Sequence, residues 1–348
     1  MHKKNGAIEL LRFALALIVC IYHFRKYNNG TIFEGGYLCV DFFFVISGFM
    51  LMKHFRNNSD SRQFYTSEEA TIKYSISRYG KLFPQHAFAW IVLVLVSSFI
   101  LHRYTIIHAV TSGIYEFFLI QITGLGIEAK INAEAWYISS LLFASLLVYW
   151  LASLNEKRYI YLIAPIVSIT ILGWIYQRNG VLDVWSAHVG FMCIGFWRGL
   201  AEVMIGSISF KIYESIKFKF EKRYMLTSTI FQILGFSLFF LFCCFGRSKY
   251  DFIIPFLAGM LTISLSIGNS YLNVMLDNDV SRYLGNLSYA IYLNQLTFQL
   301  LFSHLLPGLS FWPITIVLLV CLIIFSVFST WFVEALTRYI KDLRRNLN

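Results

Sequence analysis

Two side chains in the first apolar stretch of the chain can do chemistry, Arg12 and His23. They are eleven positions apart in the chain, and at about 100° per residue that is three turns plus about 20°, so on a helix both share one face. The same spacing puts them about 16 Å apart along the axis, roughly half a bilayer core. A guanidinium stabilises negative charge, and an imidazole transfers protons near neutral pH. The pair therefore predicts a polar interior face with acid–base chemistry.

A structural interpretation of the same pair is equally open at this stage. Arg12 can pair with Glu9, three residues earlier, while His23 lies at the opposite membrane interface. However, two ionisable groups on one face of a membrane helix are costly unless that face lines the protein interior. We therefore take Arg12 and His23 as the candidate catalytic residues.

Asp41 lies about one turn inside the second apolar stretch. Two interpretations are open: an acid favoured at a helix start by the helix dipole, or a carboxylate facing a cavity. The Ser47-Gly48 pair that follows favours packing, because small residues let a neighbouring helix approach closely.

Arg78 and Lys81 come just before Pro84 and the third apolar stretch. Topological anchoring explains both cations, and a cationic rim for a phosphate-bearing ligand is the alternative. Trp136 and Tyr137 open a later stretch at interface depth, where aromatic belt residues are the default interpretation.

The elements that must position these residues are membrane helices. Of the 348 residues, 57% are hydrophobic and 14% are charged, whereas soluble domains usually carry about 25% charged residues. Long apolar stretches run from end to end and leave no room for a sizeable soluble domain. The sequence predicts a single domain over 1–348, an all-α integral membrane bundle of about ten transmembrane helices. We expect spans near 7–27, 37–54, 84–102, 135–151, 159–176, 182–199, 225–245, 252–270, 283–302 and 312–333.

The stretch 104–127 is apolar only in parts, and the distribution of Lys and Arg decides how it is interpreted. If it does not cross, most basic residues gather on one side, including those of 53–81, of the predicted loop 198–223 and of the C-terminal tail. If it crosses, this asymmetry largely disappears. We therefore predict a re-entrant or interfacial segment, with both termini cytoplasmic.

Several other classes of function are disfavoured. The net charge of +10 does not indicate nucleic-acid binding, because the basic residues lie in short breaks between apolar stretches. The six cysteines lack CxxC spacing and the histidines lack metal-ligand spacing, so we expect neither a disulfide framework nor a metal site. The first stretch has no small-residue cleavage site and is expected to remain as a span.

Taken together, these segments resemble the membrane acyltransferase-3 family, the bacterial O-acyltransferases that modify cell-surface glycans. Three positions depart from the family pattern: Gln295 where relatives often carry His, Leu141 where an acid is common, and Lys81 where Arg is usual. The matching motifs are Leu11-Arg12-(ten residues)-His23, Gly36 with Val40-Asp41 to Gly48-Phe49, Arg78-x-x-Lys81-x-x-Pro84, Trp136-Tyr137-Ile138-Ser139, Tyr283 to Leu293, and Val333-Glu334.

The resemblance implies an enzyme of the bacterial cytoplasmic (inner) membrane. Its donor would be acetyl-CoA or another acyl-CoA, with no bound cofactor. Its acceptor would be a hydroxyl of a surface polysaccharide or of an undecaprenyl-linked oligosaccharide precursor. His23 would act as general base, and Arg12 would orient the pantetheine arm or stabilise developing negative charge. The implied substrate-binding residues are Arg78, Lys81, Asp41, Trp136 and Tyr137. The chain is similar to family members without an appended soluble hydrolase-like domain.

Two other functions fit the sequence less well. A transporter or flippase of glycan precursors would also bury Arg and His, but it would show inverted repeats with broken helices, and none is found. A glycan polymerase would carry a large external loop with catalytic Arg residues, whereas all the predicted outside loops are short.

Overall fold

The computed structural model describes residues 4–26, 30–62, 64–125, 131–219, 224–246 and 248–347. Within these ranges the chain is almost entirely helical, apart from one antiparallel hairpin of two short strands. The long helices are α1 (Gly6–Phe24), α2 (Leu38–Asn57), α4 (Ser67–Leu95), α6 (Trp136–Leu154), α8 (Ala164–Asn179), α9 (Ile194–Ile216), α10 (Met225–Phe245), α11 (Ile254–Ile267), α13 (Asp279–Leu305) and α14 (Phe311–Leu347).

Shorter elements connect them. A π-helical segment, Val96–Ile100, extends α4, and another, Tyr159–Ile163, joins α7 to α8. Single 3-10 turns precede α6 (Ala133–Ala135) and α11 (Lys249–Ile253), follow α9 (Lys217–Lys219), and lie at Gln121–Thr123. The remaining elements are α3 (Ser59–Arg62), α5 (Ile106–Phe117), α7 (Glu156–Arg158), α12 (Tyr271–Leu276), β1 (His188–Val189) and β2 (Met192–Cys193).

Eight helical segments of the described chain are long and apolar enough to cross a bilayer. Helices α9 and α13, at 23 and 27 residues, are also long enough but carry more polar side chains, most of which are buried in the bundle. The protein is an all-α polytopic membrane protein, as the sequence predicts. The eight segments are Gly6–Phe24, Leu38–Asn57, Ser67–Ile100, Ala133–Leu154, Glu156–Asn179, Met225–Phe245, Lys249–Ile267 and Phe311–Asn346.

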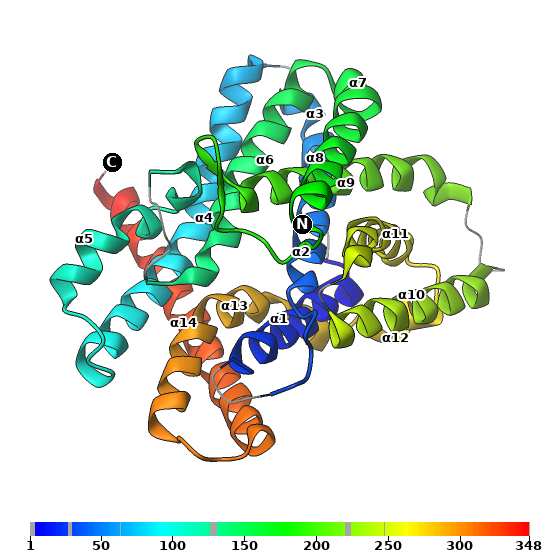
Figure 1. The fold of residues 1–348 in the computed structure, drawn as a ribbon. Coiled ribbons are helices and arrows are strands. Elements are labelled where there is room, and N and C mark those ends of the chain that lie inside the picture. The colour runs from blue at the N-terminus through cyan, green and yellow to red at the C-terminus, as the bar shows by residue number, and fades with distance from the viewer. Residues whose placement is uncertain are drawn as a thin grey trace.

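Two helix pairs form the centre of the bundle. Helix α1 packs along α13, and α2 packs along α9 (Figure 1). Helix α9 also contacts α6, α8 and α11, while α13 contacts α4 and α14. The α2–α9 contact depends on Gly48 and Gly206, because a Cβ at either position would collide with backbone of the other helix at Val203 or Val45. The packing predicted for the Ser47-Gly48 pair is thereby confirmed.

The predicted span 182–199 is wrong. Residues 182–187 are irregular, the hairpin occupies 188–193, and α9 begins only at Ile194. The predicted basic loop 198–223 is also wrong, because its larger part is helix α9. The physical reason is that α9 carries charged residues, which make it look like a loop by composition, but pairs them inside the protein. Arg198, for example, is 1% exposed and has acidic partners on α2 and α9.

The described part of 104–127 does not cross the membrane. Helix α5 has 12 residues, which at 1.5 Å per residue is about 18 Å, too short for a bilayer core of about 30 Å. The chain then turns back at Gly124, whose φ is +78°. The buried Glu116 carboxylate accepts hydrogen bonds from the backbone N–H of Ile131 and of Asn132. This segment therefore braces the turn that leads into α6.

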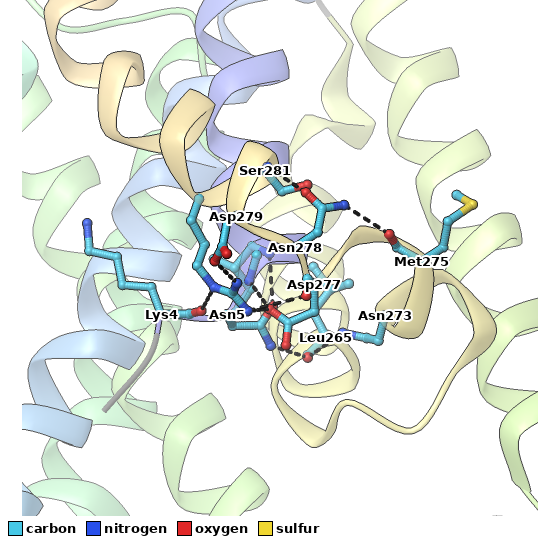
Figure 2. A network of polar contacts seen from close by, with 12 residues as sticks. Lys4, Asn5, Leu265, Asn273, Met275, Asp277, Asn278, Asp279 and Ser281 are labelled. Carbon is cyan, nitrogen blue, oxygen red and sulfur yellow. Dashed lines mark hydrogen bonds and ion pairs between the residues drawn. The ribbon is translucent and has the colours of Figure 1, made fainter. Parts of the chain in front are cut away.

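Helix α4 starts well before the expected third span. A capping box between Thr66 and Glu69 fixes its beginning at Ser67, so Arg78 and Lys81 already lie on the helix. A polar network anchors the start of α1 to the turn between α12 and α13 (Figure 2). Its centre is Arg282, which bonds the Lys4 carbonyl at 2.7 Å and the Asp277 carboxylate at 2.5 Å. The network therefore holds α1, which carries Arg12 and His23, against α13 at this end of the bundle.

Candidate active site

A cavity of about 650 Å³ opens at the end of the bundle where α1 begins. We call it the basic cavity, because five cations and one acid of the described residues make up its charged lining. Helices α1, α2, α4, α6 and α13 all contribute to it, so it exists only in the assembled bundle. Such a concentration of positive charge suits a ligand with several negative charges. The charged residues are Lys4, Glu9, Arg12, Lys53, Arg78 and Lys81.

Arg12 lines the basic cavity and also pairs with Glu9. Its Nη1 lies 3.2 Å from Glu9 Oε2, with the carboxylate 8% exposed. The pairing expected from the sequence is therefore present, and it does not remove Arg12 from the cavity. Glu9 is in turn held against α13, where only a glycine, Gly285, leaves room for its backbone.

His23 lies in a second cavity, of about 430 Å³, which we call the histidine cavity. Its Nε2 is 2.9 Å from Oε2 of Glu134, which lies in the 3-10 turn before α6. Both side chains are mostly buried, at 18% and 11% exposed. The polar and aromatic lining consists of His23, Lys26, Ser97, Arg103, Tyr104, Glu134, Trp185 and Gln299.

The turn that carries Glu134 is fixed from several sides. Asn132 donates its side-chain N–H to the Leu293 carbonyl at 3.1 Å, and Tyr292 donates its hydroxyl to the Glu134 carbonyl at 3.0 Å. Together with the Glu116 contacts described above, these bonds hold the carboxylate of Glu134 against His23. Sequence reasoning missed Glu134. Its one signal was an acid two residues before Trp136, at the entrance of a predicted span.

The His23–Glu134 pair is arranged for general-base chemistry. A carboxylate accepts hydrogen bonds only, so the neutral imidazole that faces it carries its proton on Nε2. Nδ1 is then the nitrogen with a free lone pair. The carboxylate would also stabilise the imidazolium that forms when Nδ1 takes up a proton. A base oriented by an acid is the arrangement that activates a hydroxyl nucleophile.

The two cavities lie at opposite ends of α1 and are linked through α13. Tyr289 and Tyr292 line the basic cavity, whereas Leu296 and Gln299 line the histidine cavity. Tyr292 connects them directly, because its hydroxyl bonds the residue that holds His23. Between the two groups lies Gln295, fully buried, with neither amide atom bonded in the described chain. Arg12 and His23 thus share a helix but not a cavity.

The other predicted site residues divide into two groups. Arg78, Lys81 and Tyr137 join Arg12 in the basic cavity. Trp136 lines neither cavity; it stacks on Trp185, with ring centroids 5.8 Å apart, and so supports the histidine cavity from behind. The default interpretation of Trp136 and Tyr137 as belt residues is wrong, since they are only 5% and 7% exposed.

Asp41 lies outside the linings of both cavities. It is fully buried and forms an ion pair with Arg198 at 2.6 Å, and Arg198 also contacts Glu202 at 3.3 Å. Asp41 lies in the first turn of α2, as the helix-start interpretation expects, but it does not line either cavity as a cavity carboxylate would. Its ion pair forms because α9 brings a buried guanidinium that needs acidic partners. Within the described ranges, no three His, Cys, Asp or Glu side chains are grouped to hold a metal ion.

Comparisons with known proteins bear on this site. The model of the acyltransferase-3 family, described as an acyltransferase domain, matches residues 5–335. This range includes α1 to α13 and most of α14, and therefore the linings of both cavities except Lys4. Searches of curated proteins and of solved structures found no significant match.

Proposed function

The chain belongs to the acyltransferase-3 family, and on that premise we propose that it transfers an acetyl group from acetyl-CoA to a hydroxyl of a cell-surface polysaccharide or its undecaprenyl-linked precursor. One observation carries the proposal. A basic cavity and a His–Glu pair lie at opposite ends of one helix, as a donor from one side and an acceptor on the other require.

The basic cavity supports CoA as the donor. CoA carries several phosphate charges, and Arg78, Lys81 and Lys53 line this cavity with few acidic neighbours. Basic residues gather on the cytoplasmic side of bacterial membrane proteins. We therefore place this end, with both termini, in the cytoplasm, where acyl-CoA is found, and the protein in the cytoplasmic membrane.

The transfer step uses His23. Nδ1 removes the proton of the acceptor hydroxyl while its oxygen attacks the thioester carbonyl carbon. The new C–O bond forms and the C–S bond breaks, with the electron pair leaving on the CoA sulfur. The imidazolium then returns the proton to that thiolate. A positioned general base contributes about 10²–10⁴-fold in rate.

Arg12 would bind the donor, away from the reacting atoms at His23. At about 16 Å along the axis from His23, its guanidinium suits the polar part of the pantetheine arm or a phosphate. The thioester itself would extend past Tyr292 toward the histidine cavity, since that residue lines the basic cavity and its hydroxyl donates to the Glu134 carbonyl.

The histidine cavity supports a glycan acceptor. Trp185 and Tyr104 provide aromatic faces on which a sugar ring can lie, and Lys26 and Arg103 add positive charge. Positive charge suits an acceptor that bears phosphate, as a lipid-linked precursor does.

Acetylation of surface polysaccharide tests the proposal. Mass analysis of polysaccharide from cells with the wild-type gene, without it, and with His23→Gln should show acetyl groups in the first case only. Equal membrane levels of the two proteins control for insertion. Unchanged acetylation in cells that lack the gene would overturn the proposed function.

A further inference from the structure

A third cavity, of about 470 Å³, lies between α4, α13 and α14. We call it the α14 cavity. Its charged lining is Lys81, Glu334, Arg338 and Lys341, so cations outnumber acids. None of the three cations has an ion-pair partner among the described residues; the Nε of Arg338 reaches only a backbone carbonyl, at 3.4 Å. A buried hydroxyl in the lining, Thr330 Oγ1, also lacks a hydrogen-bond partner in the described part of the chain.

The α14 cavity adjoins the basic cavity. Lys81 and Tyr289 line both of them. Lys4 of the basic cavity also donates from Nζ to Oδ1 of Asn286, a lining residue of the α14 cavity, at 2.6 Å. A ligand whose phosphates meet Arg78 and Lys81 therefore has its remaining part next to the α14 cavity.

The charged residues of this cavity lie on α4 and α14, two helices that are longer than the bilayer core is thick. The segments Ser67–Ile100 and Phe311–Asn346 have 34 and 36 residues. At 1.5 Å per residue they are about 51 and 54 Å long, against a hydrocarbon core of about 30 Å. Arg338 and Lys341 lie in the last third of the second segment and are exposed. A water-soluble anion can therefore reach them.

We propose that the α14 cavity binds the ribose 3′-phosphate end of CoA, with Arg338 and Lys341 as its ligands. The inference rests on the proposed function only in taking CoA as the donor. CoA carries two separate phosphate groups, the diphosphate and the 3′-phosphate. The basic cavity provides cations for the first, and the second needs another group of cations close by. Arg338 and Lys341 of the α14 cavity are such a group. From the sequence alone, these two cations are explained only as topological anchors.

Discrimination between CoA and 3′-dephospho-CoA tests this assignment. The full-length protein in nanodiscs of zwitterionic lipid is titrated with each ligand, and Kd is measured by equilibrium dialysis. The wild type should bind CoA about tenfold more tightly, because charged hydrogen bonds to one phosphate are worth about that factor. In Arg338→Gln/Lys341→Gln, the Kd for CoA should rise about tenfold and that for 3′-dephospho-CoA should hardly change.

Arg344→Gln/Arg345→Gln is the matched control. It removes two cations from the same helix, at exposed positions outside the cavity lining, and should keep the wild-type preference. Equal affinity of the wild type for the two ligands would overturn the assignment, and so would a preference that survives in the Arg338/Lys341 variant. A third contrary result would be a Kd that rises equally for both ligands in the Arg338/Lys341 variant, and only in nanodiscs with anionic lipid. That result would mean that the cavity holds a phospholipid headgroup.

The binding and transfer assays distinguish a failure of the 3′-phosphate assignment from a failure of the proposed function. If CoA binds with 3′-phosphate preference but acetyl is not transferred to polysaccharide, the assignment stands and the proposed function is wrong. If acetyl transfer occurs without that preference, the proposed function stands and the assignment is wrong. A wild type that binds neither ligand overturns both.

Discussion

At the scale of single residues, His23 and Glu134 are the pair on which the proposed chemistry depends. Their contact is 2.9 Å long and mostly buried, so water competes little with it. Glu34, by contrast, is an acid with a half-exposed side chain, 3.6 Å from Arg25 and outside both site cavities. Glu34→Gln is therefore a matched control for Glu134→Gln, because it removes the charge of an acid outside both cavities.

Glu134→Gln should lower kcat for acetyl transfer by at least about 10²-fold and leave KM for acetyl-CoA nearly unchanged. The amide preserves the shape of the side chain but not the charge that stabilises the imidazolium. Steady-state kinetics on purified enzyme measures both constants, with Glu34→Gln as the control that should stay near wild type. A Glu134→Gln enzyme with wild-type kcat would exclude the carboxylate from the reaction.

Arg12→Lys should raise KM for acetyl-CoA several-fold, because an ammonium lacks the planar fork that binds Glu9 and a ligand together. The same kinetic assay measures it, with protein levels matched by quantitative blotting. A fully active Arg12→Lys enzyme would show that Arg12 acts as a point charge.

At the scale of elements, the contact between α1 and α13 sets where Arg12 lies. Gly285 on α13 faces Glu9 so closely that an added Cβ would meet its backbone, which cannot move aside as a flexible side chain can. Gly173 on α8 has nothing within 4 Å of such a Cβ. The two glycines therefore differ in packing while sharing a helical environment.

Gly285→Ala should destabilise the protein by about 1–3 kcal/mol and lower its activity, because α1 must shift away from α13. Gly173→Ala should be neutral or stabilising by about 0.5–1 kcal/mol, since alanine favours a helix over glycine. Thermal unfolding in detergent, followed by intrinsic fluorescence, compares them. Equal melting temperatures for the two variants would contradict the close packing of α1 on α13.

At the scale of the whole molecule, the ends of several helices meet at one side of the membrane. Arg56 near the end of α2 pairs with Glu156 before α8 and with Glu214 near the end of α9. Lys219 follows α9 on that same side, whereas Gln177 lies at the far end of α8. Because this side carries most of the basic residues, we expect it to be cytoplasmic.

An externally added, membrane-impermeant maleimide should therefore label Gln177→Cys and not Lys219→Cys, each in a background without other cysteines. Both positions are exposed, so access does not differ for other reasons. Permeabilised cells should give labelling at both positions, which controls for reactivity. The reverse pattern in intact cells would invert the orientation of the whole bundle.

The sequence by itself determined the class of fold and the face of α1 that carries Arg12 and His23. In a bilayer every backbone polar group needs an internal partner, so long apolar stretches must be helices. Helical periodicity then fixes which side chains share a face. The same periodicity puts Arg78 and Lys81, three residues apart, on one helix face. The distribution of Lys and Arg along the chain predicted that 104–127 does not cross.

Only the tertiary structure decided which distant residues meet. Nothing near His23 in the chain indicates Glu134, because that contact depends on how α6 and its preceding turn pack against α1. Helix α9 was missed for a related reason. Hydropathy counts each charge as if it faced lipid, yet Arg198 is neutralised by Asp41, which is 157 residues away in the chain. The division of the site into two cavities has the same origin: Arg12 and His23 share a helix face, but side chains of α2, α4 and α6 line the cavity at Arg12, whereas Glu134 and Trp185 line the one at His23.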